Sequence, residues 1–129
     1  MARLRYPYLW LTIGFLLVLA VIVVSLVPHP PRVGHFRNSD KAGHFAAYMA
    51  MTLWFLLIYT RNVIRLRIAL AFIALGVALE CLQRLSGFRT FEYADIVGNV
   101  SGVLCALMLA QTPLSSALAF AERLVLRFI

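Results

Sequence analysis

The chain has 129 residues, of which 63% are hydrophobic and only 13% charged, and its mean hydropathy is +0.89. A soluble domain is about 45–50% apolar and about 25% charged, so the composition excludes a soluble globular domain and a disordered tail as first interpretations. The net charge is +7, but the basic residues lie between long apolar segments, without the interleaved aromatics of a nucleic-acid-binding surface. The length suits one domain, residues 1–129, with roughly four membrane spans.

Four apolar segments are long enough to cross the hydrocarbon core of a bilayer as helices. The first follows a short basic head, and its length without a following cleavage site favours a retained anchor over a signal peptide. It ends at Pro28, because proline cannot continue a helix, and Ser39 or Asp40 is placed to cap the second span. The sequence predicts an all-α membrane protein, a four-helix transmembrane bundle with spans over 8–27, 41–60, 68–85 and 95–111.

Arg61, Arg65 and Arg67 are expected to form a tight basic turn between the second and third spans. After the fourth span, Pro113 indicates a new helical start. An amphipathic helix lying in the membrane interface is expected over 113–128, with Glu122 on its polar side, although this segment could instead extend the fourth span.

Basic residues divide unequally between the two predicted sides of the membrane. The N-terminal head, the 61–67 turn and the C-terminal tail hold seven Lys and Arg residues, and the other side holds five together with four of the five acids. Because cytoplasmic loops carry the excess of Lys and Arg, both termini are expected in the cytoplasm. We therefore expect a multi-pass protein of the bacterial cytoplasmic (inner) membrane, in contact with membrane lipids and not with nucleic acid.

Polar residues concentrate at one end of the predicted bundle. Asp40, His44 and Tyr48 are four residues apart and share a helix face, and two further groups close the third span and open the fourth. An ionisable residue within a membrane span costs free energy, and its presence therefore indicates a functional site. We predict that they form one extracytoplasmic ligand-binding cavity. Its candidate residues are Asp40, Lys41, His44, Tyr48, Glu80, Gln83, Arg84, Arg89, Asp95 and Asn99.

A structural interpretation of the same residues stays open. Asp40 and Asp95 resemble helix N-caps, and Asn99 could hydrogen-bond between helices. Gly102 and Ala106 are spaced as a close-packing seam. Glu80 argues more strongly for function, because it follows an uninterrupted apolar stretch. We expect Glu80 to be an ion-paired carboxylate, with Lys41, His44 or Arg84 as its partner, and we expect Asp95 to pair with Arg89.

Metal and cofactor chemistry is weakly indicated. His44, Glu80 and Asp95 could supply nitrogen and oxygen ligands, but the set holds one histidine and no H-x-x-x-H pair, so no metal or cofactor is predicted. Ser39 and Ser86 lack a recognisable nucleophile motif around them. Cys81 and Cys105 lie inside apolar segments, where buried free thiols are expected.

The order and spacing of these polar residues resemble the VanZ-like family of small membrane proteins. The family pattern D-K-x-x-H-x-x-x-Y, then E-x-x-Q, then R and D, then N-x-x-G, is matched at 40–48, 80–83, 89–95 and 99–102. One departure is Ala106, where a second glycine often follows. The resemblance covers roughly residues 38 to 107. The family takes its name from a member that lowers susceptibility to teicoplanin, a lipoglycopeptide antibiotic acting on the cell wall.

Two classes of function follow from the residues and the resemblance. In the first, the protein is a non-catalytic module of the cell envelope that binds a lipid head group or a lipoglycopeptide-type amphiphile. In the second, it is a small membrane enzyme acting on an envelope lipid, with catalytic candidates His44, Glu80 and Asp95 and with His44 and Glu80 as acid and base. Since no clear nucleophile is present, the first is favoured. The oligomeric state is not indicated by the sequence.

Overall fold

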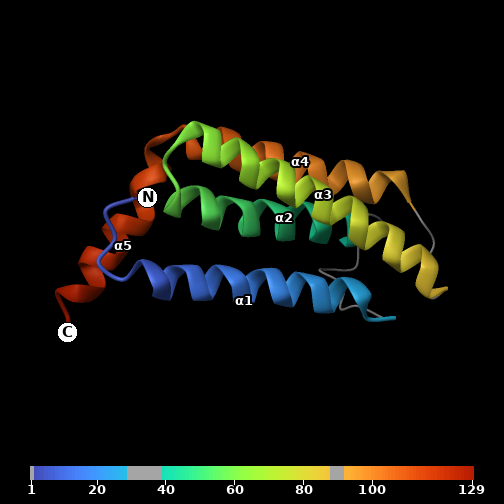
Figure 1. The fold of residues 1–129 in the computed structure, drawn as a ribbon, viewed down its shortest axis with the longest axis horizontal. Helices are drawn as coiled ribbons and strands as arrows, with labels where there is room; N and C mark the ends of the chain where they lie inside the picture. The colour runs from blue at the N-terminus through green and yellow to red at the C-terminus, as the bar shows by residue number, and fades with distance from the viewer. Residues whose placement is uncertain (1, 29–38, 88–91) are drawn as a thin grey trace.

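A computed structural model describes residues 2–28, 39–87 and 92–129, with the side chains of Ser39 and Asp40 excluded. The described residues are helical and form no strand (Figure 1). The elements are α1 (Pro7–Leu26), α2 (Ser39–Ile58), α3 (Asn62–Ser86), α4 (Tyr93–Ala110), the 3₁₀ helix η1 (Pro113–Ser116) and α5 (Ala117–Leu126). The predicted all-helical fold is therefore confirmed, with the first, second and fourth spans placed within about two residues of expectation.

Four of these helices, α1 to α4, are long and apolar enough to cross a membrane. Their surfaces fit that environment, because many large apolar side chains remain exposed; on α1, Phe15 is 63% exposed and Gly14 alone is buried. Soluble proteins rarely expose contiguous apolar patches of this kind. The structure is consistent with a multi-pass membrane protein.

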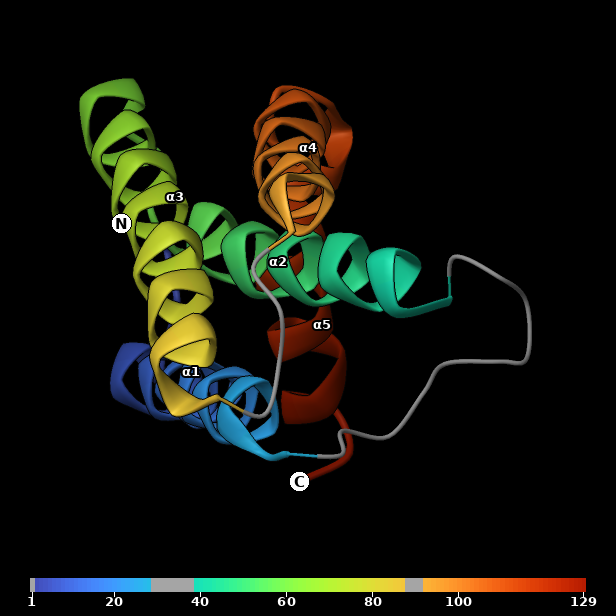
Figure 2. The same cartoon turned by 90° about the vertical axis from the view of Figure 1, so that its right-hand side faces the viewer.

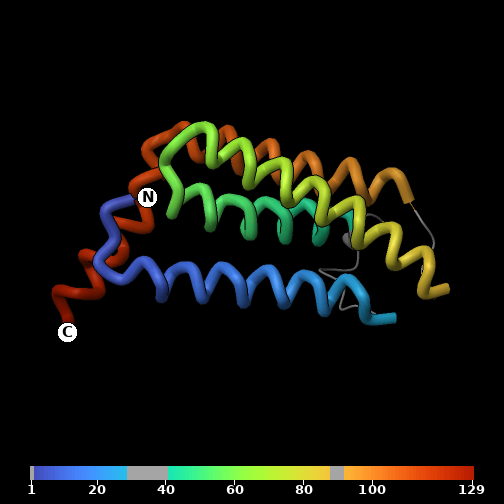
Figure 3. The backbone as a smooth tube through the Cα atoms, in the orientation of Figure 1, coloured from blue at the N-terminus to red at the C-terminus, as the bar shows by residue number. Residues whose placement is uncertain are grey.

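The four long helices run side by side, and α2 lies between the others when the molecule is viewed end-on (Figure 2). One end, here called the basic end, gathers the N-terminal head, the turn between α2 and α3, and α5 (Figure 3). The Ala2 N–H donates to the Ile58 carbonyl at 2.7 Å, which fastens the head to the end of α2. The opposite end holds the start of α2, the end of α3 and the start of α4.

Helices α2 and α4 pack with their backbones in close contact. A Cβ atom added at Gly102 would lie 2.5 Å from the Phe45 carbonyl oxygen and 3.0 Å from the Met49 nitrogen. Ala106, one turn later, is fully buried against Leu56 and partly buried neighbours. The small-residue seam suggested by Gly102 and Ala106 is therefore present, and it sets the distance between the helices that carry His44 and Asn99.

The predicted basic turn between the second and third spans is wrong. Helix α3 begins at Asn62, not near residue 68, so Arg65 and Arg67 belong to its first two turns. Arg65 is only 6% exposed, and it donates from Nε to the Tyr59 carbonyl at 2.9 Å. Its Nη1 and Nη2 atoms donate to the carbonyls of Ala110 and Leu56, each at 3.1 Å. The guanidinium thus satisfies backbone carbonyls at the ends of both α2 and α4, which lets α3 start early.

The C-terminal segment forms a separate helix rather than a continuation of α4. The helix is interrupted after Ala110, and Thr112 caps the 3₁₀ helix over 113–116 by accepting the Leu114 N–H at its Oγ1, at 3.3 Å. Helix α5 then begins at Ala117. The placement of Glu122 on an outer polar face is also wrong. Glu122 is buried on the same side as Leu118, because its carboxylate binds the N-terminal head.

Glu122 caps the start of α1. Its carboxylate accepts the Arg5 N–H at 2.6 Å, the Tyr6 N–H at 3.0 Å and the Trp10 Nε1–H at 2.8 Å. Burial would raise the pKa of Glu122, but the hydrogen bonds from Arg5, Trp10 and Tyr6 and the positive charge of Arg5 outweigh it and lower the pKa below its ordinary value. The negative charge also sits at the positive end of a helix dipole. Helix α5 therefore joins the two ends of the chain.

Candidate functional site

Three helices meet at the opposite end from the basic end, where the polar residues were predicted to converge. The contact is possible because α3 carries Gly76, whose missing side chain leaves room for Asn99 of α4 and Tyr48 of α2. A Cβ atom added there would lie 3.1 Å from Asn99 Nδ2 and 3.2 Å from Tyr48 Cε1. Glu80 follows Gly76 by one turn on the same face of α3. Tyr48, Glu80, Asp95 and Asn99 are each at most 3% exposed. With His44, Lys41 and Glu92 they form the group here called the polar cluster.

His44 joins α2 to α4 at the centre of this cluster. Its Nδ1 lies 3.2 Å from Asn99 Oδ1, and its Nε2 lies 3.8 Å from Asp95 Oδ2. Asp95 and Asn99 are one helical turn apart on α4, so they face the two nitrogens of a single imidazole ring. The predicted convergence of these three side chains is present in the structure. Both ring nitrogens face groups of the protein itself.

Glu80 is bound at the start of α4. Its Oε1 accepts the backbone N–H of Glu92 at 3.1 Å. The Glu92 side chain in turn accepts from Lys41 Nζ at 2.9 Å, so Lys41 forms an ion pair with Glu92. Tyr48 lies within electrostatic range of the Glu80 carboxylate. The carboxylate of Glu80 thus faces the protein interior.

Other predicted residues are placed differently. Gln83 is buried but turns to α1, where its Nε2 donates to the Ser25 carbonyl at 2.6 Å, so it fastens α1 rather than joining His44 and Asp95. Arg84 is exposed in the last turn of α3. The side chain of Asp40 and all of Arg89 lie outside the described residues, and so do the predicted caps by Ser39 or Asp40 and the predicted Arg89–Asp95 pair.

The alternative interpretation of Asp95 as the N-cap of α4 does not hold. The N-cap residue is Glu92, and Asp95 lies inside the first turn with its carboxylate turned to His44. Glu92 also belongs to the cluster, although it is not among the ten residues predicted from the sequence. Its partner Lys41 is 51 positions away, and no local spacing links the two. A carboxylate in the first turn is still favoured by the helix dipole, so the local pattern was compatible with either position.

The cluster is rich in carboxylate and amide oxygens and holds the ring of one histidine. Among the described residues, no group of three or more His, Cys, Asp or Glu side chains is arranged to hold a metal ion. Cys81 and Cys105 are free, and Cys81 is exposed rather than buried as expected, since it lies on the outward apolar face of α3. What the arrangement can do is exchange hydrogen bonds with a polar group placed beside apolar helices.

Comparison with known proteins gives no assignment: no protein-family model, no curated protein and no solved structure matches this chain.

Proposed function

We propose that this protein is a non-catalytic binding module of the bacterial cell envelope. Its polar cluster would recognise the head group of an envelope lipid or of a lipoglycopeptide-type amphiphile, as the VanZ-like resemblance implies. The observation that carries the proposal is the burial of Glu80, Asp95 and Asn99 together at one end of a bundle whose outer surface is apolar. Burial of polar groups costs free energy unless they are hydrogen-bonded or paired, and ionisable residues inside a membrane protein generally serve its function. Here such groups gather where three helices meet.

The polar head group and the apolar tail of an amphiphile each find a matching surface on the protein. The polar cluster supplies carboxylate, amide and ammonium groups for a head group, with Lys41 and Glu92 partly exposed at its edge. The adjoining helices expose apolar side chains, such as Leu82 of α3 and Val97 of α4, for a hydrocarbon tail. Specificity would come from the few placed polar groups and affinity from the apolar contact.

The alternative, an enzyme with His44 and Glu80 as acid and base, has less support. A general acid or base must present an atom to the reacting group. The two His44 nitrogens face Asn99 and Asp95, and Glu80 binds the Glu92 N–H. The sequence also offers no clear nucleophile beside them, and this favours binding over catalysis.

The proposal includes a location and an orientation. We place the chain in the inner membrane with both termini cytoplasmic, because the basic end gathers seven of the twelve Lys and Arg residues. The polar cluster then faces the outside of the cell. Helix α5, which exposes Phe120 and Val125, would lie in the cytoplasmic interface.

Native mass spectrometry of the protein purified from its membrane tests the proposal. The wild type should carry an envelope amphiphile, and Glu80→Gln, which keeps the shape but removes the charge, should lose it. Glu122→Gln is the matched control, since it makes the same change at the basic end. An identical set of bound lipids in wild type and Glu80→Gln would reject the proposal, and conversion of the bound lipid by the wild type would favour the enzyme.

A further inference from the structure

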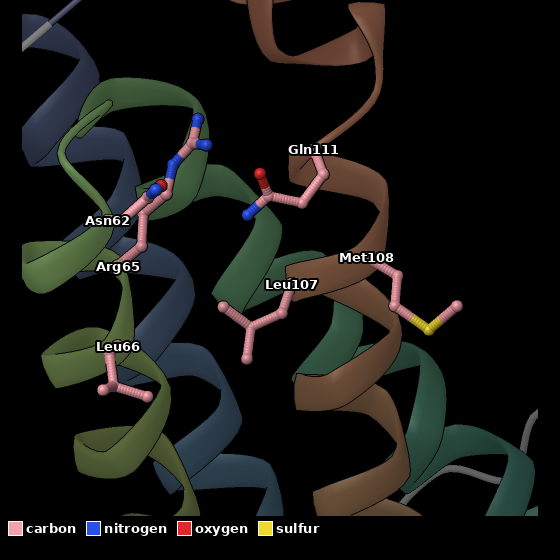
Figure 4. A pocket seen from close by; sticks show the side chains of 6 residues that line it. All are labelled: Asn62, Arg65, Leu66, Leu107, Met108 and Gln111. Carbon is pink, nitrogen blue, oxygen red and sulfur yellow. The ribbon is translucent and has the colours of Figure 1, made fainter.

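A groove lies between α3 and α4 at the basic end, far from the polar cluster. It is an open groove of about 350 Å³, lined by Asn62, Arg65, Leu66, Leu107, Met108 and Gln111. Figure 4 shows Leu107 and Gln111 of α4 pointing toward α3. The lining is divided: Leu66, Leu107 and Met108 are apolar, and the polar residues occupy the side nearer the end of the bundle.

The polar side of the groove is electropositive. It lies at the N-terminus of α3, a helix of 25 residues with no acidic residue in its first turn and no side-chain cap from Arg61. Such a terminus presents N–H groups and a partial positive charge. Arg61, next to the lining residue Asn62, is exposed. Glu122 is the acidic side chain that the structure describes at this end, and its carboxylate is bound to the head of the chain.

Arg65 adds a cation to the wall of the groove. The ends of α2 and α4 offset part of its charge, because their carbonyls carry the negative ends of two helix dipoles. Its three described hydrogen bonds go to backbone carbonyls, and the side chain is only 6% exposed. Arg65 is therefore a structural residue that also contributes positive charge beside the groove.

The apolar side of the groove opens onto the surface that lipid would cover. Leu66 is 57% exposed and Met108 is 73% exposed, on helices long enough to cross a membrane. A ligand there needs a hydrocarbon portion along Leu66 and Met108 and an anionic portion at the start of α3. We propose that an anionic phospholipid binds in this groove, with its phosphate beside Asn62 and Arg61 and an acyl chain along Leu66, Leu107 and Met108.

Titration of the detergent-purified protein with lipid, followed by native mass spectrometry, tests this site. Phosphatidylglycerol and phosphatidylethanolamine with identical acyl chains are compared. The first molecule of phosphatidylglycerol to bind should do so more tightly than the first molecule of phosphatidylethanolamine. Arg61→Gln should lower the affinity for phosphatidylglycerol about fivefold, which is the effect of one Arg near an anionic lipid. Arg67→Gln, the same change on an exposed residue of another face of α3, should leave the affinity unchanged.

A second pair of variants tests the apolar side of the groove. Met108→Trp should obstruct the groove and weaken both lipids, whereas Leu19→Trp, at an exposed position of α1, should not. Inorganic phosphate at millimolar concentration should not displace the lipid.

Equal affinity for the two lipids, equal effects of Arg61→Gln and Arg67→Gln, or no effect of Met108→Trp would overturn the proposal. So would a dimer that Met108→Trp dissociates, because a second copy would then be the occupant. Glu80→Gln should keep the phosphatidylglycerol affinity, so failure of this site and failure of the polar cluster are distinguishable.

Discussion

Buried charges in this protein are held largely by backbone groups. Arg65 donates to three carbonyl oxygens, and Glu122 accepts two backbone N–H groups and an indole N–H. Glu80 likewise accepts a backbone N–H, from Glu92. Helix ends leave such groups without intrahelical partners, and a charged side chain satisfies them strongly. Each of these residues therefore fixes where one helix ends relative to another.

Arg65→Lys should destabilise the protein although the charge is kept. A lysine ammonium is a point charge on a flexible stem and cannot reproduce the fork that reaches Tyr59, Leu56 and Ala110. We expect a loss of about 1–3 kcal/mol, the cost of leaving a buried polar group unsatisfied. Thermal unfolding in detergent measures it. Arg67→Lys, on an exposed position of the same helix, should be neutral, and equal melting of both variants would contradict the role of Arg65.

Glu122 should make stability depend on acid pH. Its pKa in the folded protein is lower than the ordinary value of 4.5, so its contribution is complete above that value and declines as the pH falls through the lowered pKa. The wild type should therefore lose more thermal stability than Glu122→Gln between pH 6 and about pH 3. Trp10 fluorescence should report release of α5 in the same range. Parallel pH profiles of the two proteins would disprove this.

At the scale of the elements, the pairing of α2 with α4 depends on small residues. Gly102 lies against the backbone of α2. At Gly98, one turn earlier, an added Cβ atom would lie 3.4 Å from the Lys41 carbonyl oxygen, which is an ordinary van der Waals contact. The two glycines share a helix face but differ in how close the partner helix comes. The pairing also places Asp95 and Asn99 opposite His44, so helix packing and site geometry are coupled.

Gly102→Ala should separate α2 from α4, because the new methyl would lie 2.5 Å from the Phe45 carbonyl oxygen. Overpacking of this kind costs about 1–3 kcal/mol. Gly98→Ala is the matched control and should change the unfolding free energy little. Both are measured by thermal or denaturant unfolding in detergent. If Gly98→Ala proved as damaging as Gly102→Ala, close approach at Gly102 would not be the determining contact.

At the scale of the whole molecule, the two ends differ in character. The basic end gathers the head, the α2–α3 turn and α5, and the other end holds the polar cluster (Figure 1). The predicted consequence is an orientation with the basic end in the cytoplasm. Reporter fusions after Arg37, Asn62, Thr90 and Ile129 should therefore read outside, inside, outside and inside. A periplasmic signal at Asn62 would reverse the orientation and place the cluster in the cytoplasm.

The sequence by itself determined the number of long helices, their approximate bounds and the end at which polar residues gather. These features follow from local quantities: span length, hydropathy, proline stops and the 3.6-residue period of His44, Tyr48, Asp95 and Asn99. The contact of His44 with Asp95 and Asn99 also follows the predicted faces. The close packing at Gly102 could be predicted for the same reason, because small residues one turn apart allow two helix backbones to approach closely.

Only the tertiary structure decided which charge meets which partner. Arg65 entered α3 because carbonyls of two other helices satisfy it, and Glu122 turned inward because the head of α1 offers it three donors. Lys41 paired with Glu92 and Gln83 with Ser25, across separations of 51 and 58 residues. Backbone groups at helix ends are the same in every sequence, so their positions relative to a given side chain exist only once the helices have packed.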